Sequence, residues 1–368
     1  MKAFAFGLAA LGLTALLFIG VLLVDGVRSL LARRLDEARR RPLDLVVRKR
    51  EEVAGHLICL SLEHPRGARL PAFEAGQHVV LFAPAGRDGR EIRRAYSLAA
   101  WRAGAPRGYE LGIKREQLGA LSSWAWDHLR EGARVRVLPP RGEFVVGPPA
   151  AELVLVGGGI GITPMRAMLH AALAAPSQFD RVVLFHAARH PQELLYRAEF
   201  EHLAQAHDQL SYLPIVSRPD AAWTGASGRL DAARLLMPLR QSGAAQFYLC
   251  AGAEVMAALR QGLMAAGIGE ANIHWEAFGV APGETRAGQR VTLANGQGFE
   301  TAGEPSLLAA LEAHGAAPES DCRAGTCGLC RMQLRRGEVK WLLAPGCALG
   351  PGEILPCVCQ AVDDLQFA

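Results

Sequence analysis

The sequence predicts a multi-domain chain of the α/β plus β class. The expected parts are an N-terminal transmembrane helix, an antiparallel β-barrel, a parallel α/β domain and a C-terminal β-grasp domain. Three observations predict this order: a long apolar run at the N-terminus, short alternating strands followed by a glycine turn between a strand and a helix, and a cysteine-rich loop near the C-terminus. With 368 residues, 50% of them apolar, the chain can hold two or three domains with cores of their own. The expected bounds are 1–42 for the anchor and a basic segment, 43–148 for the barrel, 149–280 for the α/β domain, 281–288 for a linker and 289–368 for the β-grasp domain.

Residues 3–24 form an unbroken apolar run whose only polar member is Thr14. As a helix, a run of this length spans the roughly 30 Å hydrocarbon core of a bilayer. The alternative is a cleaved signal peptide, but its apolar region would be only about 7–15 residues long and would end at a small-residue cleavage site. Residues 25–28 offer no such site. We therefore expect an uncleaved anchor that contacts membrane lipid.

Basic residues follow the apolar run directly, whereas only Lys2 precedes it. They are Arg28, Arg33, Arg34, Arg39, Arg40, Arg41, Arg48, Lys49 and Arg50. Because cytoplasmic flanks carry the excess of Lys and Arg, we expect a single-pass protein of the plasma (inner) membrane, with its N-terminus outside and its later domains in the cytoplasm. Residues 27–41 form either a basic helix on anionic headgroups or a solvated linker, and the sequence leaves both open. Pro42 ends either one.

Short runs of alternating apolar residues follow Pro42, at 45–47, 56–62 and 78–82. Gly- and Pro-containing turns separate the later runs. Strands of this length and spacing favour an antiparallel barrel or sandwich.

Inside this region lies the segment Arg94-Ala95-Tyr96-Ser97-Leu98. It resembles the R-x-Y-S-[LT] signature of the ferredoxin–NADP⁺ reductase superfamily. The resemblance implies that Arg94 neutralises a flavin phosphate, that Tyr96 lies on the face of the isoalloxazine ring, and that Ser97 bonds the ring edge near N5. A guanidinium suits phosphate and an aromatic ring stacks on a flat heterocycle, so these roles are physically sensible.

A second flavin-binding region resembles the same superfamily. Lys114 lies in the run 109–115, which resembles its next flavin strand, and Gly119, Ser122 and Ser123 precede a helix whose start would bind the flavin pyrophosphate. The sequence departs from the common Gly-Gly of this loop, because leucine stands before Gly119. The barrel most resembles the reductase half of flavohaemoglobins, which implies FAD; FMN is the alternative.

A buried strand at 152–156 runs into the turn Gly157-Gly158-Gly159-Ile160-Gly161-Ile162-Thr163-Pro164, and a helix follows. A glycine turn in this place directs backbone N–H groups at a pyrophosphate. It is not the G-x-G-x-x-G fingerprint, because Ile162 replaces the third glycine. It instead resembles the G-G-x-G-x-[TA]-P loop of the reductase superfamily, in which Thr163 would lie near the nicotinamide.

The resemblance assigns four further residues. Arg189 lies in the ribose-side region, and Arg218 follows a serine as in relatives that bind the 2′-phosphate of NADPH; NADH or NADPH stays open. Cys250 corresponds to a thiol that borders nicotinamide C4, and the alternative for it is a buried small apolar residue. Phe278, in a segment that resembles the closing E-x-F, would neighbour the flavin ring. With Tyr96 and Ser97, Cys250 completes the expected catalytic set.

Cys322, Cys327 and Cys330 have C-x4-C-x2-C spacing, which is typical of plant-type [2Fe–2S] ferredoxins. Cys357 is the expected fourth ligand, and Cys359 is its rival. A zinc site is the alternative, but zinc sites pair C-x2-C with a second such pair or with histidines, which this region lacks. The flanking hairpin with an Asn-Gly turn at 291–297 and the helix at 305–314 follow the ferredoxin order.

Together these motifs predict an NAD(P)H-dependent flavin and [2Fe–2S] reductase on a membrane anchor. Nicotinamide gives two electrons at once and the cluster accepts one, so both a flavin and a cluster are needed. The expected acceptor is a partner oxygenase, hydroxylase or desaturase associated with a membrane. The alternatives are direct reduction of a small oxidant or a quinone, and a tethered ferredoxin-like carrier with an inactive flavin site. No nucleic-acid motif is present.

Overall fold

The computed structural model describes residues 41–84, 91–116, 120–278, 287–320, 322–325, 327–343 and 345–368. The predicted anchor at 3–24, the basic segment before Arg41 and the phosphate-loop residue Gly119 lie outside these ranges. Within them, no helix is long and apolar enough to cross a bilayer. The chain divides into two compact units, Met1–Leu43 and Asp44–Ala368, and nearly all described residues belong to the second.

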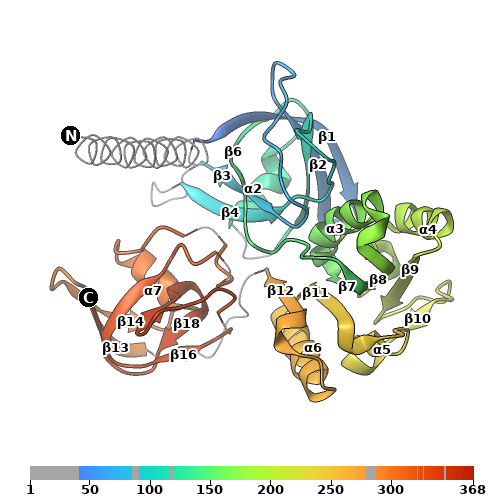
Figure 1. The fold of residues 1–368 in the computed structure, drawn as a ribbon. Helices are drawn as coiled ribbons and strands as arrows, with labels where there is room; N and C mark the ends of the chain where they lie inside the picture. Colours follow the sequence, from blue (N-terminus) through green and yellow to red (C-terminus); the bar gives the residue numbers. More distant parts are fainter. Residues whose placement is uncertain are drawn as a thin grey trace, which may run out of the picture. The chain divides into compact units, whose positions relative to one another are not determined.

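The first part of this unit is an antiparallel six-stranded sheet in the order β4-β3-β6-β1-β2-β5 (Figure 1). Its strands are β1 (Leu43–Val53), β2 (Leu57–Glu63), β3 (His78–Ala83), β4 (Ile92–Ser97), β5 (Gly108–Lys114) and β6 (Arg134–Arg141), with helix α2 (Ala120–His128) between the last two. A bridge between Leu98 and Leu111 links the segment after β4 to β5, so the two edges of the sheet meet. The predicted barrel is confirmed.

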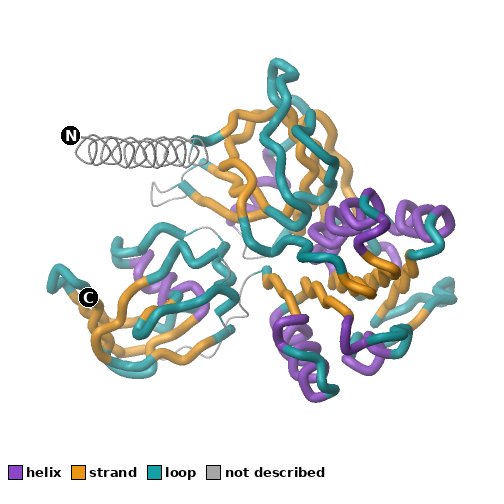
Figure 2. Tube along the Cα trace, in the orientation of Figure 1, coloured by secondary structure: helices purple, strands orange, loops and turns teal. Residues whose placement is uncertain are grey.

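The second part is a parallel six-stranded sheet in the order β10-β9-β8-β7-β11-β12. Its strands are β7 (Ala150–Gly158), β8 (Phe179–Ala188), β9 (Leu210–Val216), β10 (Ala226–Ser227), β11 (Ala245–Ala251) and β12 (Ile273–Ala277). Its helices are α3 (Ile162–Ala174), α4 (Arg197–Ala206), α5 (Ala232–Leu236) and α6 (Ala253–Ala265) (Figure 2). One apolar cluster packs α3 and α4 on the sheet and another packs α5 and α6, so both faces are covered.

The third part has the order β14-β13-β19-β15-β17, with a separate β16-β18 pair. Its elements are β13 (Ala287–Thr292), β14 (Gly298–Ala302), α7 (Leu307–Ala313), β15 (Met332–Arg336), β16 (Val339–Trp341), β17 (Glu353–Ile354), β18 (Cys359–Ala361) and β19 (Leu365–Phe367). Helix α7 begins where the Ser306 side chain accepts a hydrogen bond from the Ala309 amide (3.2 Å), and its leucines join the core of the sheet. A helix on a mixed sheet of this order is the predicted β-grasp fold.

Candidate functional site

The flavin signature lies on β4, at the edge of the barrel. The half-buried Arg94 forms no ion pair within the described chain, and its Nη1 donates to the Arg93 carbonyl (2.7 Å). Burial lowers the pKa of Arg94 to about 10, and burial raises the pKa of the Tyr96 hydroxyl. A partly buried guanidinium that forms no ion pair among the described residues, two residues from an aromatic ring on the same strand face, fits a flavin phosphate beside the flavin ring.

The described residues of the predicted pyrophosphate site lie at the end of β5 (Lys114) and in the first turn of α2 (Ser122 and Ser123). The Ser122 hydroxyl accepts from the Glu116 amide (3.1 Å), and the Ser123 hydroxyl donates to the Glu116 carbonyl (3.4 Å). Lys114 forms an ion pair with the Glu116 carboxylate (3.1 Å). These bonds join Glu116, just after β5, to the first turn of α2, where backbone N–H groups favour an anion.

The predicted nucleotide loop connects β7 to α3. Gly157 and Gly158 end the strand, a 3-10 turn takes in Gly159 and Gly161, and Thr163 lies in the first turn of α3. A Cβ atom at Gly161 would lie 2.1 Å from the carbonyl oxygen of Cys250, so only glycine allows this approach. The buried Thr163 hydroxyl donates to the Ile160 carbonyl (2.9 Å), which closes the turn.

The nucleotide loop lies directly against flavin strand β5. A Cβ atom at Gly112 would lie 2.6 Å from Thr163 Cγ2. Cys250, which is fully buried on β11, pairs in register with Gly157 on one side and Glu276 on the other. Burial raises the pKa of the Cys250 thiol, so this residue presents a neutral thiol rather than a thiolate.

Glu276 joins the two halves of this site, a role that the sequence did not reveal. The Ser97 hydroxyl donates to Glu276 Oε2 (3.3 Å), although the two residues are 179 positions apart. Glu276 is only 5% exposed, and burial raises the pKa of its carboxyl to about 8. With this raised pKa, the Glu276 carboxyl would carry a proton beside Ser97 at neutral pH.

His78 is a second site residue that sequence reasoning missed. It is 2% exposed, pairs with Ser97 in the register of β3 and β4, and places Nδ1 3.8 Å from Glu276 Oε1. Neither ring nitrogen has a hydrogen-bond partner in the described part of the chain, and burial lowers the pKa of the ring to about 4. Its only signal in the sequence is a polar residue at the head of an apolar run.

The remaining nucleotide-side predictions lie at the ends of strands. Arg189 follows β8 and Arg218 follows β9, and the Arg218 amide donates to the Arg189 carbonyl (2.8 Å). Both side chains are exposed and neither forms an ion pair among the described residues, so the pair offers two cations for a phosphate. Phe278 follows β12 and is 42% exposed; its predicted contact with the flavin stays a prediction.

The four predicted cluster ligands lie together. Thiol contacts connect Cys327 to Cys322, Cys322 to Cys357 and Cys357 to Cys330, the last at 3.3 Å. The amides of Ala324 and Cys327 donate to Cys322 Sγ (3.5 and 3.4 Å). In the described ranges, no group of three or more His, Cys, Asp or Glu side chains is arranged to hold a metal ion. Four close thiols that receive backbone N–H groups fit a two-iron cluster, which shares its ligands between two metals.

The two other cysteines of this region lie differently. Cys359 is fully buried on β18 in an apolar cluster with Val291 and Leu307, whereas Cys357 belongs to the cluster that contains Cys330. Cys347 Sγ lies 3.2 Å from the position of a Cβ atom at Gly328, beside the cysteine loop. The geometry therefore favours Cys357 over its rival as the fourth thiolate.

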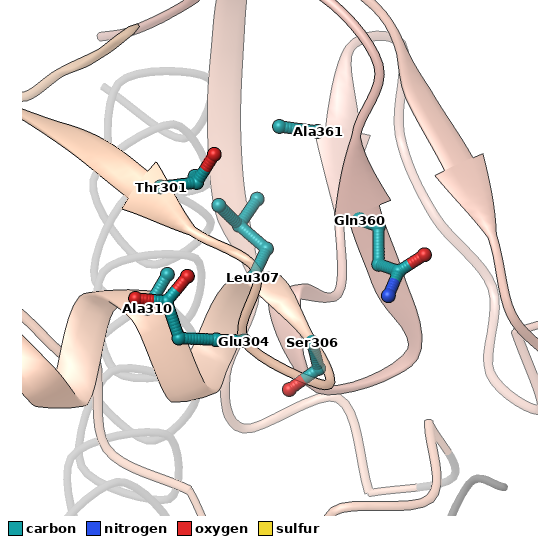
Figure 3. Close-up of a pocket in the computed structure, with 7 residues that line it drawn as sticks. All are labelled: Thr301, Glu304, Ser306, Leu307, Ala310, Gln360 and Ala361. Carbon is teal, nitrogen blue, oxygen red and sulfur yellow. The ribbon is translucent and has the colours of Figure 1, made fainter. Parts of the chain in front are cut away.

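A small, open pocket lies on the β-grasp part beside helix α7 (Figure 3). It is lined by Thr301, Glu304, Ser306, Leu307, Ala310, Gln360 and Ala361. None of these residues is a predicted ligand of a cofactor, and the Gln360 amide donates to the Pro305 carbonyl (3.4 Å). The pocket is not part of the redox site.

Three family models match the chain in the order of its three parts. "Oxidoreductase FAD-binding domain" matches residues 44–146, "Oxidoreductase NAD-binding domain" residues 155–261 and "2Fe-2S iron-sulfur cluster binding domain" residues 293–362.

Known proteins resemble the chain over most of its length. A haem-dependent oxidative N-demethylase beta subunit of Ectopseudomonas mendocina (strain ymp) is 34% identical over 276 residues, which are 74% of this chain and 80% of that protein. A flavohaemoprotein of Burkholderia sp. (strain TH2) is 34% identical over 239 residues, so the chain covers 59% of that relative and the match covers 64% of this chain. Among solved structures, phthalate dioxygenase reductase matches with a TM-score of 0.64 and 26% identity, over 89% of this chain and 97% of that one.

Proposed function

Because the chain belongs to the ferredoxin–NADP⁺ reductase family, among reductases that carry a C-terminal [2Fe–2S] domain, we propose that it passes electrons from NAD(P)H to a partner oxygenase. Membership makes it an NAD(P)H-dependent oxidoreductase, and the three domain matches confirm the predicted FAD, nicotinamide nucleotide and [2Fe–2S] cofactors. The oxygenase acceptor is supported by the likeness to phthalate dioxygenase reductase, which extends over 97% of that chain. Hydroxylases and desaturases stay within the same proposal.

The residues divide the work between the parts. Arg94 and Tyr96 would hold the flavin, the Gly157–Thr163 turn would hold the nucleotide, and the four thiols Cys322, Cys327, Cys330 and Cys357 would hold the cluster. When bound, these groups would accept two electrons from the nicotinamide as a hydride and pass them on one at a time. The Ser97 hydroxyl donates its proton to a hydrogen bond with Glu276 Oε2, where the flavin-binding part meets the nucleotide-binding part.

The link from the flavin part to the cysteine loop carries this proposal. Ala277, which directly follows Glu276, packs in one apolar cluster with Ala324, Cys330 and Cys357. Arg93, beside the flavin signature, lies 4.0 Å from the Glu319 carboxylate of the β-grasp part. The apolar contact of Ala277 with the expected cluster ligands therefore places the residue after Glu276 against the cysteine loop, which supports electron delivery from the flavin part to iron.

Reconstitution tests the acceptor. The full-length chain, loaded with flavin and cluster, is mixed anaerobically with NADH or NADPH and either an oxygenase component of the phthalate dioxygenase type or ubiquinone-1. We expect the oxygenase component to be reduced in one-electron steps with the higher kcat/KM. Faster reduction of the quinone would instead support the quinone reductase alternative, and no flavin bleaching with either nucleotide would support the electron carrier.

We further infer that residues 3–24 anchor the enzyme in the plasma (inner) membrane, with the N-terminus outside and the redox domains in the cytoplasm. The support is the length of the apolar run and the basic residues that follow it. The acceptor would then be associated with the same membrane.

Removal of residues 1–42 tests the anchor. Membrane fractions of cells should contain the full-length chain, and they should release it only with detergent. The truncated chain should be soluble and should reduce ferricyanide at the full-length rate, because its redox parts begin at β1. Equal partitioning of both chains would contradict the anchor.

A further inference from the structure

Arg166 joins the flavin-binding and nucleotide-binding parts, and no motif of the sequence identified it. It lies on α3, one turn after Thr163, and its side chain is only 12% exposed. The two parts share a continuous core there, because Leu57 and Ala75 of the barrel pack with Met165 and Leu169 of α3. A charged side chain in such a place needs a full set of partners.

The partners of Arg166 come from three separate elements. Nε donates to both carboxylate oxygens of Glu199 on α4 (2.9 Å each). Nη1 donates to Glu110 Oε2 on β5 (2.8 Å) and to the Ala99 carbonyl just after β4 (3.1 Å). One planar guanidinium therefore bonds both parts of the molecule at once, a geometry that the single charge point of lysine cannot reproduce.

Neighbouring side chains hold the guanidinium in this orientation. It stacks on the Tyr196 ring, with 4.4 Å from Cζ to the ring centroid. Tyr196 has a left-handed backbone (φ 60°), and its hydroxyl contacts Cys59 Sγ of β2 (3.5 Å). His170, one turn further along α3, also bonds Glu199 (2.7 Å). A non-glycine residue in this backbone region persists only when its surroundings fix it.

The anchor points of Arg166 are close to the reacting groups on both sides. Ala99 is two residues after Ser97, and its amide donates to the Glu110 carbonyl (2.8 Å). On the other side, Arg166 is three residues after Thr163, which lies against Gly112 of β5. The guanidinium thus links the segment just after β4 to the first turns of α3.

We propose that Arg166 is a positioning residue that sets the separation between the nicotinamide and the flavin ring by bonding Glu110 and Ala99 of the barrel to α3 and α4. Its hydrogen bonds end on Glu199, Glu110 and Ala99, so it would act on the two rings through α3, which carries Thr163, and through strand β5. Hydride transfer needs its two atoms at near-contact distance, and a displacement of about 1 Å can cost about 100-fold in rate. The inference concerns the nucleotide-to-flavin half of the reaction and does not depend on the acceptor.

Four variants test this role: Arg166→Ala, Arg166→Lys, Glu110→Gln and, as the matched control, Arg197→Ala. Arg197 also stacks on an aromatic ring, Trp223 (5.0 Å), and pairs with a carboxylate, Glu201 (2.7 Å), but all its contacts stay within the nucleotide-binding part. Each purified variant is assayed for flavin content, thermal stability, nucleotide dissociation constant, flavin reduction rate and the long-wavelength charge-transfer absorbance of the nicotinamide–flavin pair. NADH and NADPH are used in turn under anaerobic stopped flow.

We expect Arg166→Ala to keep its flavin, to lose most of the charge-transfer absorbance, and to reduce its flavin about 100-fold more slowly, with a nucleotide dissociation constant changed by less than about threefold. Arg166→Lys should be intermediate, and Glu110→Gln should slow reduction about 10-fold because only the barrel side of the contact is weakened. Arg197→Ala should match the wild type.

Two results would overturn the proposal. One is full charge-transfer absorbance and wild-type reduction in both Arg166→Ala and Glu110→Gln. The other is a folded, flavin-loaded Glu110→Gln at wild-type rate when Arg166→Ala fails to fold, because Arg166 would then serve stability alone.

Discussion

His186 is a titratable residue whose behaviour is set by burial. It is fully buried on β8, its Nδ1 lies 3.0 Å from the Tyr212 hydroxyl, and its Nε2 has no hydrogen-bond partner in the described part of the chain. Burial lowers the pKa of the ring from 6.5 to about 3. The folded chain therefore keeps this ring neutral under conditions in which the unfolded chain protonates it.

This difference predicts acid lability of the nucleotide-binding part. At His186, the unfolded chain binds one more proton than the folded chain between about pH 6.5 and 3, so the contribution of this residue to stability falls as the pH falls. For pKa values of 6.5 and about 3, His186 removes about 2 kcal/mol from the free energy of unfolding between pH 7 and pH 5. His186→Phe should lose this contribution, and denaturant unfolding of both proteins at the two pH values measures it.

Tyr212→Phe is the control, because it removes the partner hydroxyl but leaves the imidazole buried. It should keep most of the acid sensitivity of the wild type. If His186→Phe showed the same loss between pH 7 and pH 5 as the wild type, other groups would be responsible.

At the scale of elements, one arginine fixes helix α2 to strand β1. Arg50 has a side chain that is 5% exposed, and its Nη1 donates to the carbonyls of Trp126 (2.7 Å) and Leu129 (3.2 Å) at the end of α2. Its Nη2 pairs with Glu52 (2.6 Å). The opposite end of this helix carries Ser122, where the flavin pyrophosphate is expected.

Arg50→Met should therefore destabilise the barrel by roughly 2–4 kcal/mol, because two carbonyls at the helix end lose a charged donor. The same change should weaken flavin binding through displacement of α2. Arg48→Met is the matched control, since its side chain is 48% exposed and its ion pair with Glu63 is long (3.5 Å); we expect less than about 0.5 kcal/mol there. Thermal unfolding and flavin dissociation measure both, and equal effects would reject the role of Arg50.

At the scale of the whole molecule, the cysteine loop and the flavin part are separable in chemistry. The ligands of the cluster all lie between residues 322 and 357, whereas the residues expected to bind flavin and nucleotide precede residue 279. Loss of the cluster should thus leave the first half of the reaction intact.

Cys327→Ser should abolish the low-temperature EPR signal of the reduced two-iron centre and one-electron reduction of an oxygenase component, while NAD(P)H-dependent ferricyanide reduction stays close to wild type. Cys359→Ser is the control, because that thiol lies outside the group of four and the variant should keep the signal. Loss of ferricyanide reduction in a flavin-loaded Cys327→Ser protein would contradict the division of labour.

The sequence by itself determined the features that are local in the chain. Alternating apolar residues specify the barrel strands, an apolar strand followed by glycines specifies the β7–α3 turn, and C-x4-C-x2-C spacing brings three thiols together, because each depends on neighbours a few residues away. Only the tertiary structure decided which distant residues meet. The meetings of Ser97 with Glu276, of His78 with both, and of Arg166 with Glu110 depend on how strands and helices are ordered in space. For His78, Ser97, Glu110 and Glu276, which lie on strands, a shift of one residue in register would turn the side chain to the opposite face of its sheet, and no short stretch of sequence records that choice.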